Sequence, residues 1–208
     1  STLFPYTTLF RSDGETPAQL LRNADVALYR AKATGRGRFE AYRAELDRDL
    51  RENRRLQRGL RHALEEDGLE LVYQPIFDLQ GRKLAKVEAL IRWRQSSGEQ
   101  VAPGAFIPIA EASGLIHPLG GWALRTACRQ AVAWRAMGRP VKVAVNVSAA
   151  QLRQAEFAKA VQDAMGTTGL EPGLLELELT ESVFLDPSKE QIHDTLRRLA
   201  ELGVTLTI

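Results

Sequence analysis

The chain has 208 residues, of which 44% are hydrophobic and 26% are charged, and its net charge is +2. This composition is typical of a globular protein and excludes collagen-like, disordered and disulfide-rich classes. The single cysteine excludes an intramolecular disulfide and fits a reducing compartment. No apolar run approaches the roughly 20 residues that a membrane span needs, so we expect no membrane segment. The small net charge gives little support for a nucleic-acid partner.

The amino-terminal part divides into two stretches of different character. Residues 1–12 have no helical or alternating period, and they resemble a translated sequencing adapter, so we interpret them as non-native, with a natural strand end as the alternative. Thr16 and Pro17 then form a good helix start, with an N-cap followed by proline at the first helical position. Apolar residues at helical spacing predict a helix that ends before Gly35. The string LLRNADVALYRAKATGRGRF resembles the last helix and closing turn of a GGDEF (diguanylate cyclase) domain, which assigns residues 13–42 to a GGDEF tail.

Residues 43–66 are rich in both Arg and acidic residues, and they predict an exposed linker helix. A broken 4-3 apolar pattern would allow the helix to pair with a second copy of the chain, which gives a homodimer. Four arginines share one face: Arg51, Arg54, Arg55 and Arg58. Two interpretations of this face remain open. It is a solvated linker surface, which is the usual role of a charge run, or a patch that binds anions or nucleic acid.

From residue 69 onward, short apolar runs alternate with helical stretches. The predicted strands are residues 69–73, 84–93, 141–147, 174–180 and 204–208. The predicted helices are residues 106–112, 122–137, 151–165 and 189–202. This alternation predicts an α/β fold with a parallel sheet and crossover helices. No Gly-rich nucleotide-binding motif follows a strand, which favours a barrel over a doubly wound sheet.

Oxygen-bearing side chains lie at or near the carboxyl ends of three predicted strands. They are Glu88, Asn146 and Glu178. In a parallel barrel these strand ends meet at one mouth, where active sites lie. Carboxylate and amide oxygens select hard cations such as Mg²⁺, Mn²⁺ or Ca²⁺. Each residue alone also has an ordinary explanation, as a solvent-facing carboxylate or a turn-forming asparagine.

Four longer strings resemble the EAL family of cyclic di-GMP phosphodiesterases. They are YQPIFDLQGRKLAKVEALIRW, FIPIAEASGLI, VAVNVS and LELELTES, and the order and spacing match over residues 59–208. The resemblance implies a (β/α)8 TIM-type barrel and hydrolysis of cyclic di-GMP to linear pGpG by a metal-activated water. It also implies Mg²⁺ or Mn²⁺ as cofactor, cyclic di-GMP as ligand and a cytoplasmic location, although the parent protein could be tethered to a membrane.

The resemblance also implies roles for individual residues by matching position. The metal ligands would be Glu88, Asn146 and Glu178. Glu181 would support catalysis together with Glu88, by bracing the loop that shapes the metal site, and it would also serve as an N-cap neighbour of the next helix. The residues that bind substrate would be Gln74, Arg92 and Pro108.

The family's next motif, an Asp-Asp-Phe-Gly type segment, would follow the fifth parallel strand, in which Ile208 lies. We therefore expect an incomplete barrel, with residues 67–208 as a partial EAL domain after a GGDEF tail and a linker. Without the downstream Asp pair, Lys and Glu, we expect little turnover from these 208 residues alone. The alternative function is a non-catalytic, cyclic di-GMP-binding regulatory module.

Overall fold

The computed structural model describes residues 16–33, 41–66, 68–81, 83–180, 183 and 188–208. The chain divides into two compact units, residues 1–58 and 59–208. The segment interpreted as non-native, residues 1–12, lies outside the described residues. None of the described helices is both long and apolar enough to cross a membrane.

The described part of the first unit is helical. Helix α1 (Pro17–Ala33) begins as predicted, because Thr16 Oγ1 accepts from the Gln19 backbone N–H at 3.2 Å while the Gln19 side chain accepts from the Thr16 N–H at 3.1 Å. Helix α2 (Ala44–Glu65) crosses the boundary between the units.

Ion pairs on α2 neutralise part of its arginine face. The Arg51 guanidinium lies 2.9 Å from Asp47, and that of Arg55 lies 2.8 Å from Glu52. Both arginine side chains are at least half exposed, so each pair adds little stability. The pairing reduces the positive charge that this face offers to an anion.

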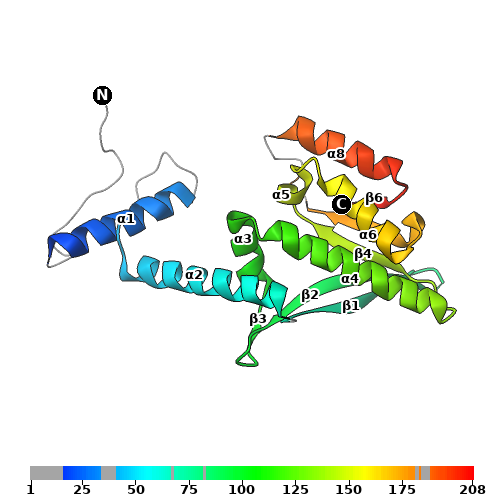
Figure 1. The fold of residues 1–208 in the computed structure, drawn as a ribbon, viewed down its shortest axis with the longest axis horizontal. Helices are drawn as coiled ribbons and strands as arrows, with labels where there is room; N and C mark the ends of the chain where they lie inside the picture. The colour runs from blue at the N-terminus through cyan, green and yellow to red at the C-terminus, as the bar shows by residue number, and fades with distance from the viewer. Residues whose placement is uncertain (1–15, 34–40, 67, 82, 181–182, 184–187) are drawn as a thin grey trace. The chain divides into compact units, whose positions relative to one another are not determined.

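The second unit contains one six-stranded sheet (Figure 1). Its strands are β1 (Leu69–Phe77), β2 (Leu84–Arg94), β3 (Gln100–Val101), β4 (Lys142–Val147), β5 (Leu175–Leu179) and β6 (Thr205–Thr207). The order is β1-β2-β4-β5-β6, with β3 paired to β2. In the described part of the chain β1 and β6 are therefore edges and the sheet is open. The expected fold class, a partial barrel with parallel strands, is confirmed.

The first strand pair departs from the expected parallel arrangement. β1 and β2 are antiparallel, with Gln74 opposite Glu88, whereas β2, β4, β5 and β6 run parallel. The reason is the short connection between Phe77 and Leu84, because a parallel crossover needs a dozen or more residues. The short strand β3 was not predicted.

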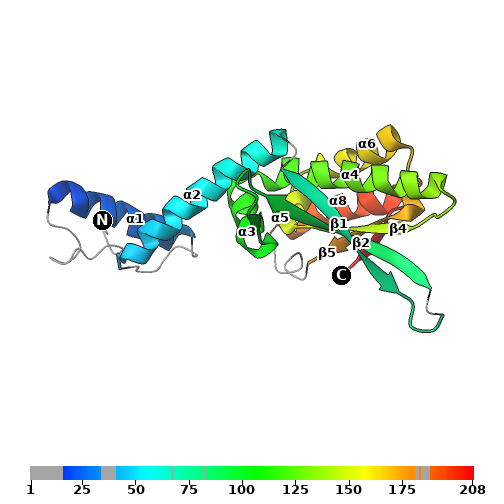
Figure 2. The same cartoon turned by 90° about the horizontal axis from the view of Figure 1, so that it is seen from below.

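Helices cover one face of the sheet (Figure 2). They are α3 (Pro103–Ser113), α4 (Ile116–Ala136), α5 (Ala149–Leu152), α6 (Phe157–Thr168) and α8 (Lys189–Glu201), with a 3-10 turn η2 (Pro172–Leu174) before β5. The single helix expected at residues 151–165 is wrong, because α5 ends at Leu152 and α6 starts at Phe157. The Ser148 hydroxyl and the Gln151 side chain form a capping box that starts a separate short helix.

The core lies between the sheet and helices α4, α6 and α8. On β5, Leu175, Leu177 and Leu179 enter this core, so the alternating residues Glu176 and Glu178 lie on the opposite face. On the helix side the core is apolar and includes the free thiol of α4. Burial raises the pKa of the Cys128 thiol to about 11, so it stays protonated at neutral pH.

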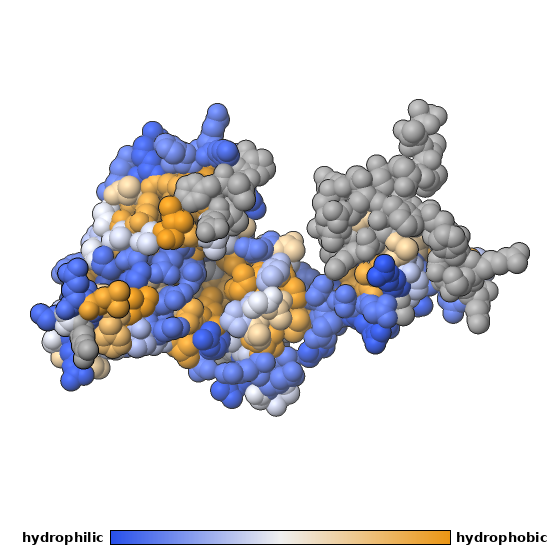
Figure 3. All heavy atoms as spheres, turned by 180° about the vertical axis from the view of Figure 1, so that it is seen from behind, coloured by the Kyte–Doolittle hydropathy of each residue, from blue (hydrophilic) through white to orange (hydrophobic). Residues whose placement is uncertain are grey.

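On the face of the second unit that Figure 3 shows, hydrophilic and apolar side chains are mixed. Large exposed apolar side chains gather at the far end of the β1–β2 hairpin, where Phe77, Leu79 and Leu84 are exposed. At the carboxyl end of β2 the large apolar side chains are buried instead of exposed. Trp93 and Phe106 are fully buried and meet edge to face, with ring centroids 5.7 Å apart.

Candidate metal and phosphate site

The sheet register brings the three predicted metal ligands onto one face. Glu88 on β2 pairs with Ala144 on β4, and Asn146 follows two residues further along the same face. Asn146 pairs directly with Glu178 on β5. Neighbouring strands lie about 4.8 Å apart, so Asn146 and Glu178 lie side by side, while Glu88 lies on the next strand and two residues nearer the amino ends. We call these three side chains the row.

Asn146 is the centre of this row. Its Nδ2 donates to Glu88 Oε1 at 2.7 Å. Asn146 is exposed, while Glu88 and Glu178 are half-buried, so the row is open to solvent on the polar face of the sheet. Gln74 is exposed and lies opposite Glu88 on β1, which places it beside the row.

The donor set of this row fits a hard divalent cation. Two carboxylates and one amide supply only oxygen ligands, which Mg²⁺ and Mn²⁺ prefer. No cluster of three His, Cys, Asp or Glu side chains suited to a metal occurs among the described residues. A cation at this row would therefore rely on the Asn146 carbonyl oxygen as its third protein ligand, after rotation of the amide away from its present hydrogen bond.

An ion-pair cluster that includes Glu178 adjoins the row, and within it Glu176 is buried while Lys86 is half-buried. Lys86 Nζ donates to Glu176 Oε1 and to Glu178 Oε1, each at 2.6 Å. Glu176 Oε1 also accepts from Thr207 Oγ1 at 2.8 Å, and Lys142 Nζ lies 3.8 Å from Glu176 Oε2. The cluster therefore links strands β2, β4, β5 and β6.

The charges of this cluster stabilise one another. Hydrogen bonds to Glu176 and Glu178 raise the pKa of Lys86 above its ordinary value. Burial raises the pKa of the Glu176 carboxyl, but hydrogen bonds from Lys86 and Thr207, together with the nearby Lys86 and Lys142 charges, outweigh burial and lower it overall. Lys86 and Glu176 are thus both charged at neutral pH.

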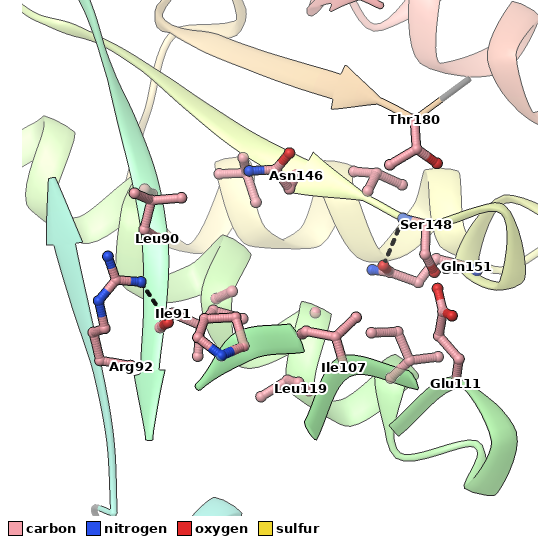
Figure 4. A pocket seen from close by; sticks show the side chains of 17 residues that line it. Leu90, Ile91, Arg92, Ile107, Glu111, Leu119, Asn146, Ser148, Gln151 and Thr180 are labelled. Carbon is pink, nitrogen blue, oxygen red and sulfur yellow. Dashed lines mark hydrogen bonds between the residues drawn. The ribbon is translucent and has the colours of Figure 1, made fainter. Parts of the chain in front are cut away.

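A pocket of about 230 Å³ adjoins the row at the carboxyl ends of β2 and β4 (Figure 4). Asn146 belongs to both the row and the pocket. Most of the pocket wall is apolar, and its polar side chains include Arg92, Glu111 and Gln151. The Arg92 guanidinium donates to the Ile91 carbonyl at 3.0 Å, which holds it at the rim.

The other predicted site residues fall in different places. Leu90 and Arg92 line the pocket, whereas Glu88, which shares their face of β2, lies in the row beside it. Pro108 lies inside α3, is exposed, and is not among the residues lining the pocket, although its neighbour Ile107 is. Glu181 lies outside the described residues.

Sequence reasoning missed Lys86, Glu176 and Gln151. Strand alternation places Glu176 on the face of Glu178 and Lys86 on the face of Glu88, and that period was the available signal. Gln151 is buried, and its Oε1 accepts from the Ser148 N–H at 3.1 Å. The spacing of Ser148 and Gln151 is that of a capping box, which would have predicted the contact.

Gly120 on α4 leaves the space that Gln151 occupies. A Cβ at position 120 would lie 2.0 Å from Gln151 Nε2, so Gly120→Ala must displace this side chain and break the capping box. We expect a loss of about 1–3 kcal/mol in the free energy of unfolding, measured by urea denaturation.

At Gly121 a Cβ would meet only the exposed Arg125 side chain, at 3.2 Å. Gly121→Ala is therefore the matched control, expected to be neutral or to stabilise by up to about 1 kcal/mol. Equal effects of the two variants would contradict this packing.

Comparison with known protein families identifies the family of this chain. A family model described as "EAL domain" matches residues 57–208. The chain belongs to the EAL domain family. The row and the pocket described above both lie within the EAL domain.

Curated relatives of this EAL chain match almost its whole length. The "Uncharacterized signaling protein" of Caulobacter vibrioides is 41% identical over 201 residues, which is 97% of this chain and 24% of that protein. The "Cyclic di-GMP phosphodiesterase NbdA" of Pseudomonas aeruginosa is 38% identical over 202 residues, covering 97% of this chain and 26% of that protein. The EAL chain thus spans about a quarter of the length of these curated relatives.

Solved structures resemble this chain. The phosphodiesterase PaMucR, in complex with c-di-GMP, is 37% identical with a TM-score of 0.69, covering 74% of this chain and 62% of that one. The FimX EAL domain of Xanthomonas citri, also in complex with c-di-GMP, has a TM-score of 0.68 but only 23% identity, so it supports the fold alone.

Proposed function

We propose that this protein is a metal-dependent cyclic di-GMP phosphodiesterase that cuts one phosphodiester bond and releases linear pGpG. The observation that carries the proposal is the row of Glu88, Asn146 and Glu178 on adjacent strands, beside a pocket with an arginine at its rim. The names of NbdA and of the PaMucR complex agree with this substrate class.

In this proposal Glu88, Asn146 and Glu178 hold Mg²⁺ or Mn²⁺. When bound, the cation supplies Lewis acidity to the phosphate and lowers the pKa of a water molecule. The close contact between Asn146 and Glu88 keeps two of these side chains within reach of one ion.

The other side chains bind and orient the dinucleotide. Arg92 offers a planar set of donors that suits a phosphate. Gln74 lies beside Glu88 and would hydrogen-bond to the dinucleotide. The apolar pocket wall, which includes Ile107 and Leu119, would pack against a base and exclude water from it. Glu181 is proposed to support the loop after β5.

The same proposal covers the setting of the domain. Residues 13–42 would be the end of a GGDEF domain, residues 43–66 a linker that pairs with a second copy, and residues 67–208 part of the EAL domain. Because cyclic di-GMP is a cytosolic messenger, the domain would work in the cytoplasm. We propose no nucleic-acid partner, since the Arg51 and Arg55 side chains pair with carboxylates of the same helix.

The test is hydrolysis of cyclic di-GMP by the full-length protein, followed by separation of product from substrate. With Mg²⁺ or Mn²⁺ we expect pGpG, and with excess chelator we expect none. Binding of cyclic di-GMP without metal-dependent product would contradict the enzymatic function and support the regulatory module instead.

A further inference from the structure

Lys86 occupies a position that neither the sequence motifs nor the proposed chemistry uses. It lies on β2 two residues before Glu88 and faces the same side of the sheet. Its ammonium lies between two carboxylates of the neighbouring strand, with Nζ 2.6 Å from both Glu176 Oε1 and Glu178 Oε1. Only one of these carboxylates, Glu178, belongs to the proposed metal ligands.

Glu176 anchors the ammonium of Lys86. Its side chain is only 7% exposed. Thr207 on β6 donates to Glu176 Oε1 at 2.8 Å, and Lys142 on β4 lies 3.8 Å from Glu176 Oε2. The carboxylate is therefore held from both sides of β5, which fixes the point to which Lys86 is attached.

The anchored ammonium of Lys86 in turn restrains the Glu178 carboxylate. Its Oε1 accepts from Lys86, and this is the carboxylate's hydrogen bond within the described residues. Such a bond restrains the rotation of the carboxylate and leaves Oε2 for a cation. Partners of this kind orient metal ligands in general, and their loss typically weakens metal binding by about 10- to 100-fold.

A different interpretation is that the ammonium competes with the cation for Glu178. The register argues against it. Lys86 pairs with Lys142, whereas Asn146 lies four residues further along β4 and makes its hydrogen bond to Glu88. The backbone of Lys86 therefore lies toward the amino ends of the parallel strands, and its ammonium reaches the row only through Oε1 of Glu178.

We propose that Lys86, anchored by Glu176, is a positioning residue that holds the Glu178 carboxylate in place for binding of the divalent cation. This inference rests on the proposed metal site. What it adds is that Lys86 orients Glu178 within that site. It predicts a selective loss of metal affinity in variants that remove the brace.

The experiment is titration of the metal-free, full-length protein with Mn²⁺, followed by electron paramagnetic resonance of the free ion. We expect Lys86→Met to raise the Mn²⁺ dissociation constant by roughly 10- to 100-fold. Because Lys86→Met leaves Glu176 buried without its main partner, the double variant Lys86→Met/Glu176→Gln is measured as well, and it should show the same weakening. Lys142→Met is the matched control, because Lys142 contacts Glu176 but not Glu178, and it should stay within about three-fold of the wild type.

Two results would overturn the proposal in distinguishable ways. If wild-type protein binds Mn²⁺ and loses it in Glu178→Gln, while both Lys86 variants bind as tightly as wild type or more tightly, the brace is wrong and the metal site stands. If Glu178→Gln binds Mn²⁺ like wild type, the metal site itself is wrong, and the brace falls with it. Circular dichroism melts of each variant establish that the protein measured is folded.

Discussion

Glu88→Gln is expected to lower the rate of cyclic di-GMP hydrolysis by the full-length protein by roughly a hundred-fold or more. The change removes one negative charge from the row but keeps an oxygen that can accept from Asn146, now 2.7 Å from Glu88 Oε1. The loss should therefore come from metal binding rather than from unfolding. Since loss of a ligand's hydrogen-bond partner alone typically costs about 10- to 100-fold, loss of the charged ligand should cost at least as much.

The control for this prediction is Glu201→Gln, which makes the same chemical change at an exposed position near the end of α8. It should hydrolyse cyclic di-GMP at the wild-type rate. Initial rates are measured at the lowest Mn²⁺ concentration that saturates the wild type, so that weaker metal binding by the variant lowers the rate. A Glu88→Gln variant that keeps more than about a third of the wild-type rate would remove Glu88 from the metal site, given the size of loss expected for a ligand.

The largest effect on stability is expected at Trp93. Its side chain is 1% exposed and packs edge to face on Phe106 of α3, and a Cβ on Gly59 of α2 would lie 3.0 Å from its ring. Trp93→Ala would leave a large cavity between α2, α3 and β2. We expect the free energy of unfolding to fall by about 3–5 kcal/mol. The carboxyl end of β2, which carries Arg92 into the pocket, should loosen as well.

Trp134→Ala is the matched control for this cavity. Trp134 on α4 also makes an edge-to-face contact, with Tyr73 at 4.9 Å, but it is only half-buried. We expect a loss of about 1–2 kcal/mol there, because less apolar area leaves water on folding. Urea denaturation of both variants gives the comparison. A smaller loss for Trp93→Ala than for Trp134→Ala would show that β2 is not anchored in this way.

The polar face of the sheet could be predicted from the sequence because strand residues alternate. That period puts Glu176 and Glu178 on the sheet face opposite the leucines between them. It likewise puts Glu88 on the face opposite the core residues Val87 and Ala89. The type of each donor then indicates a hard cation. Periodicity gives no register, however, and the contact between Asn146 and Glu88 depends on how β2 pairs with β4.

Long-range pairs could not be predicted for the same reason. Lys86 and Glu176 are 90 residues apart in sequence, and each alone is an ordinary charged strand residue. Trp93 was placed at a strand end by its sequence position, and its complete burial depends on α2 and α3 packing over it. The break between α5 and α6 is not predicted because helical spacing continues across Arg153, although Ser148 and Gln151 have the spacing of a capping box.

The most direct test of the metal site is a crystal structure of the full-length protein grown with Mn²⁺ and cyclic di-GMP, with anomalous scattering used to locate the ion. We predict a manganese peak about 2.1 Å from oxygens of Glu88, Asn146 and Glu178, with a phosphate of the dinucleotide beside it. A manganese peak that touches none of these three side chains, in a crystal that holds the dinucleotide, would contradict the account.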